Sequence, residues 1–156
     1  MSSLKGKLNS VMFLWIGFGL AIVTMIMIAI PAIEIPILGI KNSAEIFWDQ
    51  SPGMKGNWPL FVGYMAILLG GLMMGFTALS FVQPSALVEK IILIAAGVLF
   101  VLGIVLLASF KEIYMSMNDI TGTAQKLVDA HPGPYIGAGL AGGALVADAV
   151  ALALDW

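Results

Sequence analysis

The strongest constraint on this chain is that it contains four separate runs of about 20 apolar residues. The runs cover residues 11–31, 59–82, 87–110 and 135–154. A helix of about 20 apolar residues is needed to cross a hydrocarbon layer roughly 30 Å thick. Because backbone amides in lipid must be satisfied within their own segment, each run is predicted to be a transmembrane α-helix. The expected fold is an all-α integral membrane protein built as a four-transmembrane-helix bundle.

Composition supports the membrane class and excludes others. Hydrophobic residues make up 60% of the 156 residues and charged residues only 10%, whereas soluble domains carry about 25% charged residues. All seven basic residues are lysines and the net charge is -2, so we expect no cationic surface dense enough to bind nucleic acid. The absence of cysteine excludes disulfides and thiolate metal sites. We therefore expect a single polytopic membrane domain over residues 1–156, surrounded by membrane lipids.

Four crossings place both termini on the same side of the membrane. The outer loops then cover approximately residues 32–58 and 111–134, and a short link at 83–85 lies with the termini. Lys5 and Lys7 precede the first helix, and lysine near helix ends favours the cytoplasmic side. We expect both termini in the cytoplasm and a multi-pass location in the plasma membrane. The use of Lys without Arg, with abundant Ile, indicates a microbial source.

Each outer loop is predicted to contain a short helix at the membrane interface. Residues 42–45 (Asn-Ser-Ala-Glu) have the spacing of an N-terminal capping box. Trp48 and Trp58 are predicted to anchor this first loop at headgroup depth, as aromatic belts do. In the second loop we expect the third helix to extend through residues 111–118, and residues 124–130 to form a further amphipathic turn.

Small residues mark the surfaces where the helices are expected to touch. Helices in lipid associate through close packing of small residues, because the hydrophobic effect does not act between them. Gly71 and Gly75 form a Gly-x-x-x-Gly pair in the second run, and Gly139, Gly143 and Ala147 repeat every four residues in the fourth. These five positions are predicted to make helix contacts, either within the bundle or with a partner subunit.

Asp148 is the one charged residue that cannot be placed at a membrane boundary by these spans. It lies about two turns inside the fourth run, where an isolated carboxylate costs about 2.5–3.5 kcal/mol on insertion scales. It is predicted either to be protonated, donating a hydrogen bond to Thr77 or a backbone carbonyl, or to be ionised and paired with Lys90. An intramembrane carboxylate can also be a proton or cation site. A further reading is that the helix ends early and leaves Asp148 at the interface.

Signals for other chemistry are weak. Asp129 and His131, the single histidine, could contribute to a metal site, and Met115 and Met117 form a thioether pair that soft copper accepts. We expect His131 to be exposed in its loop, and none of these residues to bind a metal. The run at 137–142 partly matches a dinucleotide fingerprint, but no strand precedes it. We expect no enzymatic activity, and no cofactor in this chain apart from bound lipid.

The layout is similar to that of claudin-like tetraspan proteins, with a longer first outer loop and a shorter second one. Claudins carry tryptophans followed by two cysteines in the first loop, whereas this chain has Trp48 and Trp58 but no cysteine. The resemblance is one of topology and implies no junction-forming role. The sequence favours a small accessory, assembly or scaffolding subunit of a larger membrane complex. Its alternatives are a small proton- or cation-coupled transporter or channel using Asp148, and a self-associating tetraspan-like protein.

Overall fold

Four long helices dominate the structure, a computed structural model that describes residues 2–35, 39–49, 55–79, 86–118, 120, 122 and 127–154. The helices are α1 (Ser2–Ile26), α3 (Trp58–Leu79), α4 (Ala86–Ala108) and α6 (Gly133–Leu154). Each contains a stretch long and apolar enough to cross a membrane. The predicted spans are therefore confirmed as helices, with ends that differ by a few residues.

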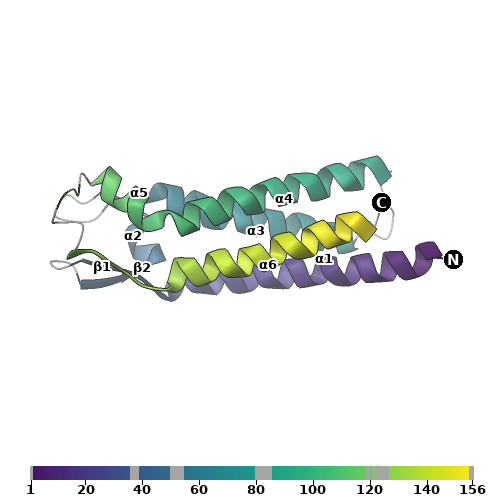
Figure 1. Ribbon diagram of the computed structural model, residues 1–156, viewed down its shortest axis with the longest axis horizontal. Helices are drawn as coiled ribbons and strands as arrows, with labels where there is room; N and C mark the ends of the chain where they lie inside the picture. The colour runs from purple at the N-terminus through teal and green to yellow at the C-terminus, as the bar shows by residue number, and fades with distance from the viewer. Residues whose placement is uncertain are drawn as a thin grey trace.

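The four helices lie side by side in one bundle (Figure 1). α1 and α4 each pack against both α3 and α6, which gives the cyclic order α1, α3, α4, α6. Both chain ends lie at one end of the bundle, here called the terminal end, and the sheet described below lies at the opposite, outer end. The link at 83–85 and the last predicted residues of the second span, 80–82, lie outside the described residues.

The first helix ends earlier than predicted. α1 stops at Ile26 and continues as a single 3-10 turn, η1 (Met27–Ala29), after which Ile30 is extended with ψ 146°. The residue before a proline is disfavoured in the helical region. Pro31 therefore directs the chain into a strand at the position where residues 29–31 were expected to complete the span.

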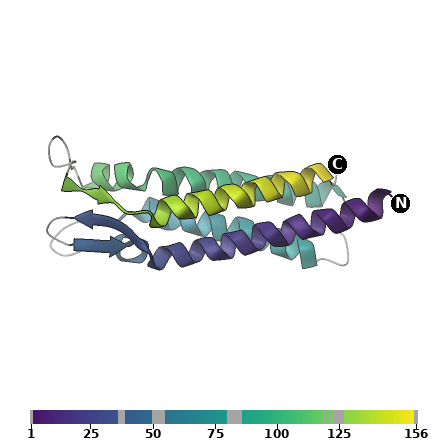
Figure 2. The same ribbon diagram turned by 60° about the horizontal axis from the view of Figure 1, so that its bottom comes forward.

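A small sheet at the outer end is the main feature that the sequence did not predict (Figure 2). It consists of β1 (Pro31–Ile35), β2 (Gly39–Asn42) and β3 (Asp129–Ala130), antiparallel and in the order β2-β1-β3. β3 corrects the expected amphipathic turn over 124–130, of which residues 124–126 lie outside the described part. β3 pairs with β1, which lies far from it in the sequence. Next to this pairing, the His131 amide donates to the Ala32 carbonyl at 2.8 Å.

The short helices of the outer loops are partly as predicted. α2 (Ser43–Ile46) begins with the expected capping box: the Glu45 amide donates to Asn42 Oδ1 at 2.9 Å, and the Asn42 amide donates to Glu45 Oε2 at 2.8 Å. α5 (Phe110–Met117) covers the predicted extension of the third span, but a turn at Ser109 separates it from α4.

Asn57 joins the outer ends of α3 and α5. Its side chain is fully buried, its Nδ2 donates to the Phe110 carbonyl at 2.9 Å, and its Oδ1 accepts the Leu60 amide at 3.1 Å. It therefore caps the start of α3 and satisfies a carbonyl at the start of α5. Asn118 adds a second link, because its Nδ2 donates to the Lys55 carbonyl at 3.0 Å.

Candidate functional site

Asp148 lies inside the bundle, on the face of α6 that meets α4. Only 3% of the residue is exposed, and its Oδ1 accepts no hydrogen bond from the described part of the chain. A Cβ placed on Gly97 of α4 would lie 3.0 Å from Oδ2 of Asp148 and 3.8 Å from Cδ1 of Leu145. The absence of a side chain at Gly97 is therefore what makes room for the carboxyl between the two helices.

Neither predicted partner of Asp148 is placed beside its carboxyl by a described contact. Thr77 donates its hydroxyl to the Met73 carbonyl of its own helix at 2.8 Å. Lys90 lies on the same side of α4 as Gly97, about 10 Å nearer the terminal end along the helix axis. Depth in the membrane had suggested Thr77, but its helix α3 lies diagonally across the bundle from α6. Lys90 was expected to reach inward along its long side chain.

Ser10 is a polar residue near this site that sequence analysis missed. Its side chain is 2% exposed, and its hydroxyl donates to the Ala151 carbonyl at 3.3 Å. Ala151 is one turn beyond Asp148 on α6. Ser10 precedes the apolar run assigned to the first span, so only the pairing of α1 with α6 shows that it is buried.

Three of the predicted small residues pack against α1. A Cβ on Gly71 would collide with the Ala21 side chain, one on Gly75 would lie 2.7 Å from the Phe18 ring, and one on Gly143 would lie 3.1 Å from Leu20. Ala147 is buried as well. Gly139 differs, since a Cβ there would meet nothing within 4 Å.

A close backbone approach between α3 and α4 involves glycines that were not predicted as helix contacts. A Cβ on Gly103 would lie 2.8 Å from the Gly63 carbonyl oxygen, and one on Gly63 would lie 2.8 Å from Leu107. A Cβ on Gly70 would lie 3.2 Å from the Ala96 carbonyl oxygen. The seven-residue spacing of Gly63 and Gly70 along α3 was an available signal, because it places both on one helix face.

One face of α6 remains uncovered by the rest of the bundle. We call it the open α6 stripe and define it as Gly139, Gly142, Val146, Ala149 and Ala153. Gly142 is partly exposed and the other four are exposed. A Cβ at either glycine would meet nothing within 4 Å. The spacing of three and four residues places all five on one side of the helix.

The exposed face of α4 has the opposite character. It carries large side chains, among them Ile91, Ile94, Val98, Val101 and Val105, each at least 49% exposed. The contrast with α6 shows that the two helices offer different surfaces to whatever surrounds the bundle.

The two predicted tryptophan anchors both lie at the outer end. Trp58 is the first residue of α3 and Trp48 follows α2, and their exposed fractions are 59% and 61%. The Trp48 ring contacts Phe61 with ring centres 5.3 Å apart. The structure thus leaves both indoles exposed, as anchoring requires; their depth in a membrane stays a prediction.

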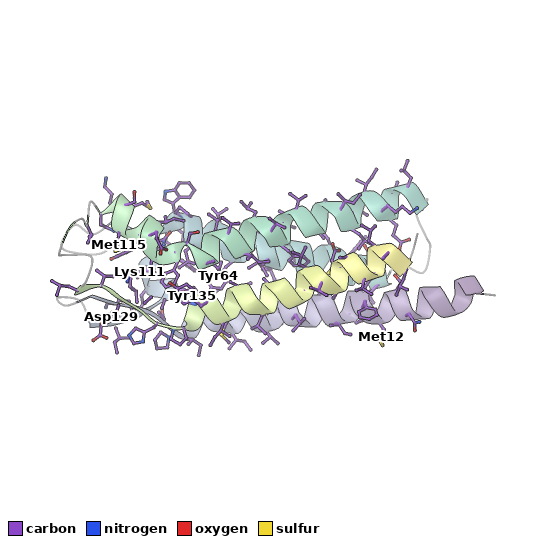
Figure 3. All side chains as sticks on the ribbon, in the orientation of Figure 1. Met12, Tyr64, Lys111, Met115, Asp129 and Tyr135 are labelled. Carbon is purple, nitrogen blue, oxygen red and sulfur yellow. The ribbon has the colours of Figure 1, made fainter. Side chains whose placement is uncertain are left out.

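The residues considered for metal binding are engaged in other contacts or lie on separate elements. His131 Nε2 is 3.3 Å from Oε2 of Glu34, which is an ion pair when the imidazole is protonated. Met115 packs against the buried core from α5, whereas Asp129 lies on β3 (Figure 3). Met117 is the last residue of α5. Within the described residues, no group of three His, Cys, Asp or Glu side chains is arranged to hold a metal ion.

Comparison with known proteins assigns no family to the chain, since no protein-family model, curated protein or solved structure matches it. The class defined by the fold is a mostly helical chain with four helices long and apolar enough to span a membrane.

Proposed function

We propose that this chain is a small, non-catalytic accessory subunit that assembles with a larger complex of integral membrane proteins. The observation that carries the proposal is the open α6 stripe, whose small residues are not used by the chain's own bundle. The occupant we propose is a transmembrane helix of a partner protein.

The stripe fits a helix better than it fits lipid alone. Glycine in a helix is about 0.8–1.0 kcal/mol less favourable than alanine, so Gly139 and Gly142 weaken α6 without supporting any described contact in the bundle. Small residues at spacings of three and four let a second backbone approach closely, which is how helices associate in lipid. The bulky face of α4 offers no comparable surface.

The test compares variants on the two exposed faces. Gly139→Leu and Gly142→Leu fill the stripe, and Val98→Leu on α4 is the control for an exposed leucine outside the stripe. Each protein is extracted gently in lipid nanodiscs, and its complex is measured by native mass analysis. We expect a fixed set of partner subunits with the unaltered chain and with Val98→Leu, and loss of those partners with the stripe variants.

Two other results would overturn the proposal. A lone monomer, or partners that persist in both stripe variants, would show that the open α6 stripe does not bind a partner helix. An assembly made only of copies of this chain would favour the self-associating tetraspan-like alternative. Circular dichroism and thermal unfolding of each variant check that the bundle still folds.

The alternative function, a transporter or channel, is tested by a measurement of flux. Asp148 is a buried carboxyl in a predicted span, and proton or cation flux through it would disappear in Asp148→Asn. Flux in proteoliposomes that contain only this chain, lost in that variant while folding persists, would replace the accessory role. We place the protein in a microbial plasma membrane with cytoplasmic termini on the lysine argument given above.

A further inference from the structure

Two buried polar side-chain atoms have no hydrogen-bond partner in the described part of the chain, a neutral hydroxyl and a carboxyl oxygen. One is the hydroxyl of Tyr114 at the outer end, and the other is Oδ1 of Asp148. A carboxylate that serves only as a structural anchor accepts hydrogen bonds that hold its charge. The unpartnered Oδ1 of Asp148 therefore points to a role beyond anchoring.

The surroundings of Asp148 suit a proton better than a metal cation. Its carboxyl lies opposite Gly97, where an added Cβ would be 3.0 Å from Oδ2 and would otherwise meet only the apolar side chain of Leu145 within 4 Å. Metal cations such as Ca²⁺ take six to eight oxygen ligands, and the described residues hold no group of three acids, histidines or cysteines. A proton needs one carboxyl oxygen only.

The carboxyl of Asp148 lies close to the terminal end of the bundle. Asp148 is six residues before Leu154, the last residue of α6, so it lies about 9 Å from that end of the helix. Along this stretch the buried hydroxyl of Ser10 donates to the Ala151 carbonyl. A hydroxyl both donates and accepts hydrogen bonds, so Ser10 is a polar group between Asp148 and this end of α6.

Other titratable groups on the packed elements lie away from the carboxyl. On α4 they are Glu89 and Lys90, near the terminal end. α3 carries Tyr64, whose hydroxyl is 3.2 Å from Ser43 Oγ at the outer end. α6 itself carries Tyr135 in its first turn. α1 carries only the two lysines that precede Asn9, and no acid, histidine or tyrosine.

We propose that Asp148 is a proton-binding site within the helix bundle, whose carboxyl takes up and releases a proton between α4 and α6. The neutral form fits the space opposite Gly97, and the charged form draws water from the terminal end into the same space. This inference is independent of the accessory role, because it concerns the core of the bundle and not the open α6 stripe.

The test is infrared difference spectroscopy of the purified chain in lipid bilayers across a pH series. The carbonyl stretch of a protonated carboxyl reports the state of Asp148 directly. We expect a band that disappears reversibly as the pH rises, is absent in Asp148→Asn, and persists in Glu34→Gln, which removes a part-exposed carboxyl of the sheet. Gly97→Ala should shift the midpoint of the change, and Gly139→Ala should not.

Several results would overturn the inference. If Lys90 or another cation holds the carboxylate charged, no protonated band appears at any pH. A band that does not change with pH means a fixed structural acid, and a band that survives Asp148→Asn belongs to another group. If Asp148→Asn does not fold, the Gly97→Ala and Gly139→Ala pair decides, since equal midpoints exclude the site. The infrared measurement needs no partner protein. Its result therefore tests the proton-binding site independently of the proposed accessory function.

Discussion

The contact between Gly63 of α3 and Gly103 of α4 gives a direct test of the packing in this bundle. In the structure a Cβ on Gly103 would lie 2.8 Å from the Gly63 carbonyl oxygen, a separation that real Cβ atoms essentially never show. The same Cβ would also collide with the Ile67 side chain of α3, so both a side chain and the backbone of α3 stand in its way. Gly103→Ala therefore requires the two helices to move apart locally.

The size of the effect follows from that distance. Reaching an ordinary contact of 3.4 Å needs a displacement of about 0.6 Å, and overpacking of a well-packed interior costs about 1–3 kcal/mol. The gain in helix propensity from Gly to Ala is about 0.8–1.0 kcal/mol. We expect a net loss of up to about 2 kcal/mol in the free energy of unfolding.

Gly139→Ala is the matched control, because it has the same propensity gain in α6 but adds a methyl group where nothing lies within 4 Å. The two variants should differ by about 1–3 kcal/mol, which isolates the steric cost. The measurement is reversible unfolding in mixed micelles of mild and denaturing detergent, followed by tryptophan fluorescence. Equal stabilities of the two variants would refute the close approach of α3 and α4 at Gly63.

Three further predictions concern the outer end. Asn57→Ala removes a helix cap worth about 1 kcal/mol and a buried hydrogen bond to the Phe110 carbonyl worth about 1 kcal/mol, so detergent unfolding should show a loss of about 2 kcal/mol; no loss would contradict the cap. His131→Gln breaks a part-exposed pair with Glu34 and should change the free energy of unfolding by under about 1 kcal/mol; a larger loss would show that the pair holds the sheet. Burial raises the pKa of Tyr114 above 10.0. The free energy of unfolding therefore falls as the pH rises above 10.0, because Tyr114 ionises in the unfolded chain before it ionises in the folded one. Tyr114→Phe should therefore lose less stability in alkaline thermal unfolding and remain as stable at neutral pH, because the hydroxyl has no described partner; an unchanged alkaline loss would contradict this.

Helix positions and one helix cap were predictable because they depend on local sequence. Four apolar runs long enough for a membrane specify helices regardless of what they pack against. The capping box at Asn42 and Glu45 is equally local, since both hydrogen bonds close within four residues. Pro31 was a visible helix stop, although the strand that follows it was not.

The sheet and the partners of Asp148 were not predictable in the same way. β3 has two residues and pairs with β1 across almost 100 positions of the chain, so its own sequence carries little strand signal. Thr77 was proposed for Asp148 from depth alone. Gly97 supplies the contact instead, because α4 and not α3 adjoins α6.

The sequence by itself determined that the chain has four membrane-length helices and that Asp148 falls inside the last of them, because length and hydropathy act within each segment. Only the tertiary structure decided which small residues pack against another helix of the bundle. Gly71, Gly75 and Gly143 are filled by α1, and Gly139 and Gly142 remain open. The physical reason is that the sequence does not specify which way a glycine faces in the bundle. Its role depends on the atoms opposite, and those are set by the order of the helices around the bundle.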